Sequence, residues 1–111
     1  MSTYQQALSL QDRKILVKEL KTIVPNAMPM VLNINKTYQK YFIQNPNQWN
    51  IARLEDAIKR HCKPIFPIDL FVHGEKIPNE DLLSIYLRFQ DTDGNLYITC
   101  LEKQEEDYII V

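Results

Sequence analysis

Apolar residues in the first part of the chain recur at the spacing of an amphipathic helix. Between residues 10 and 24, Leu16, Leu20 and Ile23 fall on one face, and the lysines of the same run fall on the opposite face. Ser9 stands where a helix N-cap is expected, and a proline follows the run. We therefore expect a helix over residues 10–24, with its apolar face in the core.

The next segment, residues 30–44, also carries apolar and aromatic residues at a helical period. Ile34, Tyr38 and Tyr41 keep this period. A second helix is the first prediction for the segment. A short strand over residues 30–34 is the alternative, because β-branched residues are frequent there.

An Asn-Pro-Asn sequence at residues 45–47 breaks this pattern. It favours the start of another helix, because proline is well tolerated in a first helical turn. Ile51, Leu54 and Ile58 then recur at helical spacing, and the basic residues that follow suit the negative end of the helix dipole. We expect a third helix over residues 47–62.

After Pro64 the pattern changes: residues 68–73 are apolar enough for a strand, and from Ser84 onward the apolar positions alternate with a period of two, which is typical of strands. Residues 78–81 are expected either to open a short helix or only to bend the chain. The predicted strands cover residues 68–73, 84–90, 96–101 and 108–111, with turns at Gly74, 91–95 and 104–107.

Helices first and strands afterwards indicate an α+β fold class. We expect one domain over residues 1–111. In it, about three N-terminal helices pack on one face of a C-terminal, mostly antiparallel sheet of three to four strands, connected in succession as a β-meander.

A total charge of −1 hides an uneven distribution of charge. Residues 1–63, the predicted helical half, carry ten Lys or Arg residues against four Asp or Glu residues. Residues 64–111, the predicted strand-rich half, carry three against ten. Charge steers partners rather than determining a fold. A charge-polarised surface suits electrostatic docking to a protein partner, and it also permits self-association into a homo-oligomer.

The candidate binding residues are basic residues of the first half and the single tryptophan. They are Lys14, Lys18, Lys21, Lys36, Lys40, Arg53, Lys59, Arg60, Lys63 and Trp49. We favour a small non-catalytic binding or regulatory protein (an adaptor, an inhibitor or a minor subunit) that acts through a protein partner. Nucleic-acid binding by residues 1–63 is the alternative, because cations neutralise phosphates and exposed aromatic rings stack on bases.

No residue pattern indicates catalysis, a metal or a cofactor. His61, Cys62, His73 and Cys100 lack the close pairing that is usual for zinc ligands. Gly94 comes too early in its acidic turn for a calcium loop. With two glycines in the chain, no phosphate-binding loop is expected.

No segment approaches the roughly 18 uninterrupted apolar residues of a membrane span, and the first residues lack the pattern of a secretory signal. The two isolated cysteines do not indicate a disulfide framework. We therefore expect no membrane partner and a cytoplasmic location. No motif is diagnostic of a named family.

Overall fold

The computed structural model describes residues 3–34, 36–64 and 67–102. Helices and strands are interleaved along the chain rather than segregated into two halves. In order they are α1 (Thr3–Ala7), α2 (Leu10–Ile23), β1 (Met28–Ile34), β2 (Thr37–Ile43), the 3-10 turn η1 (Pro46–Gln48), α3 (Ile51–Cys62), β3 (Ile68–Val72), β4 (Glu75–Lys76), α4 (Leu82–Phe89) and β5 (Leu96–Glu102).

Strands from both halves of the chain form one described sheet, in the order β2-β1-β5-β3-β4. β1 pairs antiparallel with β2 and parallel with β5. β3 pairs antiparallel with both β4 and β5. The sheet is therefore mostly antiparallel, but β5 lies at its centre and the predicted β-meander is wrong. The strand predicted over residues 108–111 lies outside the described residues.

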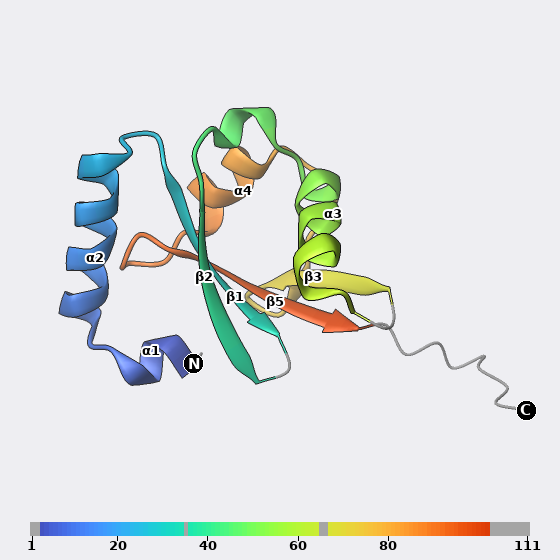
Figure 1. Ribbon diagram of the computed structural model, residues 1–111, viewed down its shortest axis with the longest axis horizontal. Coiled ribbons are helices and arrows are strands. Elements are labelled where there is room, and N and C mark those ends of the chain that lie inside the picture. Colours follow the sequence, from blue (N-terminus) through green and yellow to red (C-terminus); the bar gives the residue numbers. More distant parts are fainter. Residues whose placement is uncertain (1–2, 35, 65–66, 103–111) are drawn as a thin grey trace, which may run out of the picture.

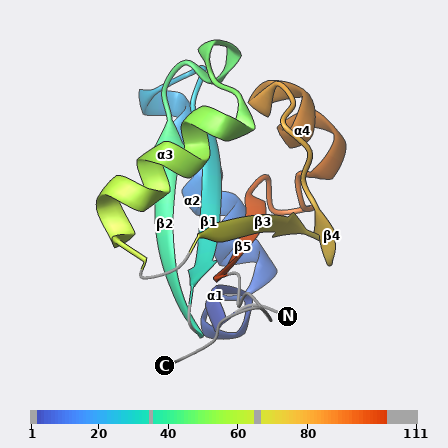
Figure 2. The ribbon, with the colours of Figure 1, turned by 90° about the vertical axis from the view of Figure 1, so that its right-hand side faces the viewer.

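Helices cover both faces of the sheet, not one face as predicted (Figure 1). α3 and α4 lie on one face, which is turned toward the viewer in Figure 2, and α1 and α2 lie on the other. The main apolar core fills the space between the sheet, α3 and α4. Its most deeply buried members include Leu32, Leu54, Leu70, Leu82, Ile85 and Ile98.

β1 and β2 form a hairpin, so the helix predicted over residues 30–44 is wrong. Met30 pairs with Tyr41 and Leu32 pairs with Gln39. The first five residues of β1 are all buried because helices cover both faces of this strand. Continuous burial removes the alternation that would have identified a strand. The alternative prediction, a strand over residues 30–34, is correct, and residues 1–63 are therefore not wholly helical.

α4 replaces the strand predicted over residues 84–90. Asp81 caps this helix, because its carboxylate accepts hydrogen bonds from Ser84 N–H at 3.3 Å and from the Ser84 hydroxyl at 3.1 Å. The buried residues of α4 recur at helical spacing. In a segment of only eight residues, the sequence is compatible both with this spacing and with the alternation of a strand. Of the two predictions for residues 78–81, the opening of a short helix is correct.

The helix predicted over residues 47–62 exists, but α3 begins at Ile51. Asn50 is its N-cap, and the Asn50 side chain accepts a hydrogen bond from Arg53 N–H at 2.8 Å. Pro46 starts the separate turn η1 instead.

α2 begins at the predicted cap, where Ser9 accepts a hydrogen bond from Asp12 N–H at 3.1 Å. Its buried residues are Arg13 and Val17, however, and not the predicted apolar face. Ile23 is 80% exposed.

Polar contacts dock α2 on the turn between α4 and β5. Arg13 Nη1 lies 2.8 Å from Asp93 Oδ2 in a buried ion pair, and the Tyr97 hydroxyl donates to the same carboxylate. Burial opposes the charge of Arg13, but its hydrogen bonds to Tyr97 and Asp93 outweigh this and raise its pKa. Burial, with the hydrogen bond to Asp93, also raises the pKa of Tyr97. Nearby, the Tyr86 hydroxyl donates to Gly94 O at 2.6 Å.

Two glycines offer a test of this docking. Gly94 and Gly74 have φ angles of +89° and +79°, so alanine strains the backbone at either position by about 1–2 kcal/mol. A Cβ on Gly94 would also lie 2.8 Å from Val17 Cγ1 of α2, whereas no described atom lies within 4 Å of one on Gly74. We expect Gly94→Ala to reduce the free energy of unfolding more than Gly74→Ala, by at least about 1 kcal/mol in urea denaturation.

The control is the double variant Gly94→Ala with Val17→Ala, which removes the clashing methyl groups. In a double-mutant cycle, its loss of unfolding free energy should be smaller than the sum of the losses in the two single variants. Equal losses for the two glycine variants would contradict close packing of α2 on this turn.

Candidate functional site

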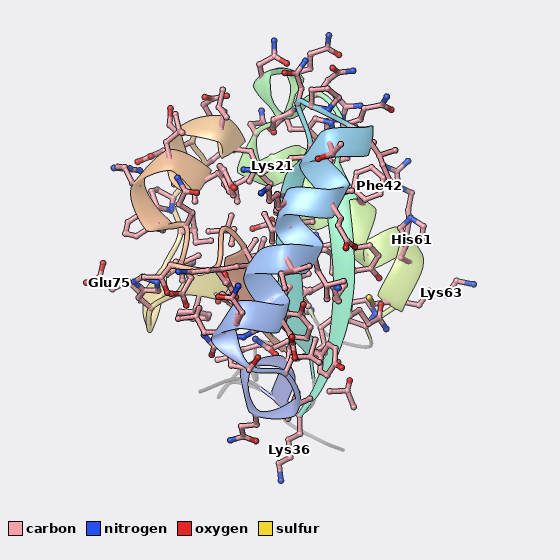
Figure 3. The ribbon with its side chains drawn as sticks, turned by 90° about the vertical axis from the view of Figure 1, so that its left-hand side faces the viewer. Lys21, Lys36, Phe42, His61, Lys63 and Glu75 are labelled. Carbon is pink, nitrogen blue, oxygen red and sulfur yellow. The ribbon has the colours of Figure 1, made fainter. Side chains whose placement is uncertain are left out.

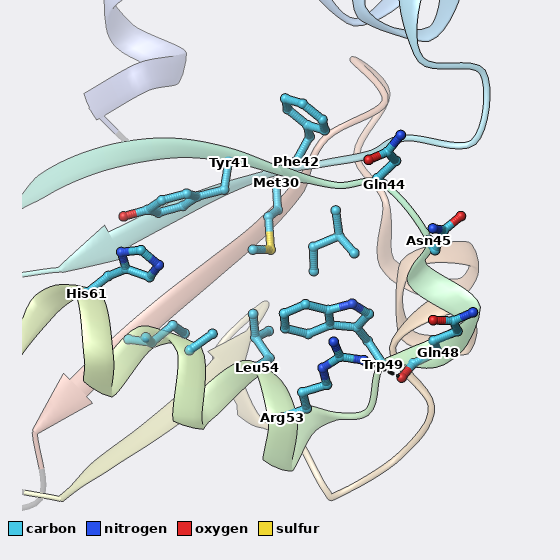
Figure 4. A pocket seen from close by; sticks show the side chains of 13 residues that line it. Met30, Tyr41, Phe42, Gln44, Asn45, Gln48, Trp49, Arg53, Leu54 and His61 are labelled. Atoms are coloured by element: carbon cyan, nitrogen blue, oxygen red, sulfur yellow. Dashed lines mark hydrogen bonds between the residues drawn. The ribbon is translucent and has the colours of Figure 1, made fainter.

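β2 forms one edge of the sheet. It pairs with β1 on one side, and no described strand pairs with its other side. The N–H and C=O groups on that outer side are available to another chain. Ile43 belongs to the core on the α3 face, whereas Lys40 lies over the ring of Tyr4 of α1 and Phe42 points away from the α3 face (Figure 4).

A pocket of about 340 Å³ lies between β2 and α3 (Figure 4), and we call it the α3 pocket. Met30 of β1 and Leu54 of α3 form its apolar interior. Trp49 lies at one end, and Tyr41 and His61 lie at the other, with their ring centroids 6.5 Å apart. The pocket is therefore an apolar slot that runs beside the free edge of the sheet.

Both the side chain and the backbone of Trp49 are held by other residues. The Arg53 guanidinium lies 4.1 Å from the centroid of the indole ring, and Arg53 Nη1 donates to Gln48 O at 3.0 Å. Trp49 O accepts a hydrogen bond from Leu82 N–H at 3.0 Å, and this bond joins the start of α3 to the start of α4. Contacts within the fold therefore hold Trp49 in position at the end of the pocket.

A second pocket, of about 200 Å³, lies between β2 and α2, on the other face of the sheet; we call it the α2 pocket. Its apolar walls are Leu16 and Leu20 of α2, Pro29 of β1 and Phe42 of β2. Phe42 is 50% exposed. The two leucines that were expected in the core therefore line a surface pocket instead.

The described residues that line the two pockets include no carboxylate. Lys40 contributes a positive charge to the α2 pocket, and Arg53 contributes one to the α3 pocket. Arg60 follows Arg53 by seven positions, which places it on the same face of α3. Neither Lys40 nor Arg53 forms an ion pair with a described carboxylate, so their charges are not neutralised within the fold.

The structure divides the basic residues that the sequence singled out. Lys40, Arg53 and Trp49 line the pockets, Lys36 immediately precedes β2, and Lys59, Arg60 and Lys63 lie on α3 or at its end. Lys21 points away from this group, because its ammonium donates to the Tyr86 hydroxyl of α4 at 3.0 Å. Figure 3 shows Lys21 on the α4 side of α2 and Phe42, His61 and Lys63 on the other side. Lys14 and Lys18 share the helical face of Lys21.

Apart from Trp49, the main apolar residues that line the two pockets were not predicted as binding residues from the sequence. Leu16 and Leu20 were assigned to the core, and Met30 and Phe42 to a helix that does not exist. The sequence of α2 did contain one indication of a surface pocket. Its apolar residues lie around more of the helix circumference than a single buried face can accommodate.

The described residues offer little for catalysis or metal binding. Burial raises the pKa of Cys100 to about 11, which keeps the thiol protonated at neutral pH and disfavours a nucleophilic role. His73 packs edge-on against Phe89 with ring centroids 5.8 Å apart. No described cluster of three or more His, Cys, Asp or Glu residues could hold a metal ion. None of the helices in the described part of the chain is long and apolar enough to cross a membrane.

Comparison with solved structures identifies the fold. Plasmodium falciparum Atg8, solved in complex with a Plasmodium falciparum Atg3 peptide, matches with a TM-score of 0.78 at 18% sequence identity. The match covers 93% of this chain and 98% of that chain. Trypanosoma brucei ATG8 matches with a TM-score of 0.75 at 12% identity, over 90% of this chain and 93% of that one.

This chain therefore has an Atg8-like, ubiquitin-like fold. No protein-family model and no curated protein matches the sequence.

The single tryptophan of the chain reports on the α3 pocket. Because Arg53 covers one face of the Trp49 ring, we expect Arg53→Ala to increase acrylamide quenching of tryptophan fluorescence and to shift the emission to longer wavelength. Lys59→Ala, an exposed position on α3 for which no contact with Trp49 is described, is the control and should leave both unchanged. Unaltered quenching in Arg53→Ala would mean that the guanidinium does not cover the ring.

Proposed function

We propose that this chain is a non-catalytic protein-interaction module, an adaptor that binds an extended acidic segment of a partner protein along the free edge of β2. The observation that carries the proposal is that this edge has a pocket on each face. A segment that adds to the edge as a further strand would gain main-chain hydrogen bonds, and its side chains would occupy the pockets.

The alternation of a strand defines the spacing of the two anchoring side chains. Successive residues of a strand point to opposite faces of the sheet. One anchor for the α3 pocket and one for the α2 pocket are therefore separated by an odd number of positions in the bound segment. The Plasmodium falciparum Atg8 structure supports a peptide ligand for this fold, because it was solved with an Atg3 peptide.

The charges around the pockets favour an acidic segment. Lys40 and Arg53 contribute to the lining, and no described lining residue opposes them. Charge complementarity of this kind accelerates association and selects partners. The two free cysteines fit a reducing compartment such as the cytoplasm.

The nucleic-acid alternative has less support. The lysines of α2 that were expected to join a common basic face lie with Lys21 on the far side of the helix from β2. Trp49, the aromatic residue among the candidate binding residues, lines the α3 pocket together with Tyr41.

Two charge reversals of equal size test the proposal. The probe is a short acidic peptide with an aromatic residue and a leucine three positions apart, and binding is measured by isothermal titration calorimetry. We expect Lys40→Glu to weaken binding by about five- to tenfold, because the introduced carboxylate repels the acidic peptide at the α2 pocket. Lys18→Glu changes the net charge by the same amount on the opposite side of α2 and should change the affinity by less than about twofold.

Equal weakening in the two variants would contradict docking at β2, and an absence of binding to any acidic peptide would contradict the function itself. Mobility-shift assays with single- and double-stranded DNA and RNA address the alternative. Submicromolar binding at physiological salt, well below the roughly 10⁻⁴–10⁻⁶ M nonspecific range, would favour nucleic acid instead.

A further inference from the structure

The free edge of β2 and the pockets on its two faces, which together we call the β2 groove, set three requirements for a bound segment. The segment must extend as a strand, because it adds to the edge of a sheet. It must carry two apolar side chains an odd number of positions apart, one for each face. Negative charge beside them complements Lys40 and Arg53 of the lining.

Residues 105–111 of this same chain, which we call the 105–111 segment, meet these requirements. The segment begins with the one run of three consecutive acidic residues in the sequence. Four residues of types that are enriched in strands come next: Tyr108, Ile109, Ile110 and Val111. Tyr108 and Val111 are three positions apart, so their side chains would point to opposite faces of an extended segment.

The charges of the segment and of the groove are opposite. The segment contains Glu105, Glu106 and Asp107 and no basic residue. The groove is built from α2, β2 and α3, which belong to the part of the chain where ten basic residues stand against four acidic ones. The uneven division of charge along the chain is therefore what a segment and a groove of one protein need in order to attract each other.

The length of chain after β5 decides which groove the segment can occupy. Glu102 is the last residue of β5, and Tyr108 follows it by six positions, which span at most about 22 Å when fully extended. A strand added outside β2 would lie three strand spacings from β5, which is about 14 Å.

The distance along the strands is also large. Lys40 pairs with Val31, and Val31 pairs with Tyr97, so Lys40 and Tyr97 lie at the same level of the sheet. Glu102 lies five residues beyond that level, which is about 16 Å. The direct line from Glu102 to the added strand beside Lys40 is then about 22 Å and passes through β1 and β2. Any path around these strands is longer, so the segment does not reach the groove of its own chain.

We infer that the β2 groove binds the 105–111 segment of a second copy of this chain, so that copies associate head to tail. Tyr108 and Val111 of one copy enter the pockets of the next copy, one in each, and the acidic run lies beside Lys40 and Arg53. The contact is heterologous, because each copy contributes its groove to one neighbour and its segment to another. This inference rests on the proposed peptide-binding function and names this chain as one of its own partners.

Sedimentation equilibrium of the full chain tests the contact. We expect the mean mass to rise with protein concentration, and to rise less at high salt, because salt screens the attraction between the acidic run and the basic groove. Lys18→Glu lies on the side of α2 away from β2 and is the control for a change of net charge. It should alter the association constant by less than about twofold.

Two double variants remove the two halves of the contact separately. The groove variant is Lys40→Glu with Phe42→Ser, at a phenylalanine that is 50% exposed and lines the α2 pocket. The segment variant is Tyr108→Ser with Val111→Ser. Each should weaken self-association by at least about tenfold, because each removes buried apolar area from the contact.

An equimolar mixture of the two variants is the decisive sample. The segment variant supplies an intact groove and the groove variant supplies an intact segment, so the mixture retains one working contact. We expect it to form pairs whose mass stays at two copies when the concentration is raised, whereas wild-type protein continues to grow. Because each variant must supply a working half, pairing also shows that both variants are folded.

The outcomes separate this inference from the proposed function. Wild-type protein that stays monomeric while it binds the acidic probe peptide would overturn the inference and leave peptide binding at β2 intact. Self-association that persists in either variant, or a mixture that forms no pairs, would also overturn it. Tighter binding of the probe peptide by the segment variant than by a monomeric wild type would mean that the segment occupies its own groove, which contradicts the head-to-tail contact. Absence of both self-association and peptide binding would overturn the two proposals together.

Discussion

The insertion of β5 between β1 and β3 is the constraint on which the rest of the structure depends. β5 pairs parallel with β1 and antiparallel with β3, so it joins a hairpin from the first half of the chain to a hairpin from the second. Its alternate residues Leu96, Ile98 and Cys100 are buried in the core. Because the centre of the sheet is filled in this way, β2 remains at the edge and its outer backbone groups stay available to another chain.

The way in which α2 docks explains why a pocket exists beside that edge. The helix is held by the buried ion pair of Arg13 with Asp93 and by close packing of Val17 against Gly94, rather than by burial of a full apolar face. Leu16 and Leu20 are thereby left to line a pocket with Phe42. The same turn that anchors the helix also contributes Asn95, which is buried, to the lining of the pocket.

The local sequence pattern predicted the long helices that have their own polar caps. It failed where the structure depends on pairing between strands that are far apart in the sequence. α2 and α3 each have a strong polar cap and a sustained period, and both were predicted. The hairpin over residues 28–43 depends on pairing with β5 some sixty residues later, which no local pattern reveals. Charge and aromatic content singled out Lys40, Arg53 and Trp49, but the pocket walls come from separated segments, and a buried Asn95 resembles any polar turn residue in sequence.

The most direct measurement of strand addition at β2 is backbone amide hydrogen exchange, read residue by residue by NMR, with and without a saturating acidic peptide. If a segment adds to the free edge, alternate amides of β2 that point outward become protected, while amides already bonded to β1 change little. Uniform protection of β2 would indicate general stabilisation, and protection confined to other parts of the described chain would place the ligand elsewhere. Either of these results would contradict the account.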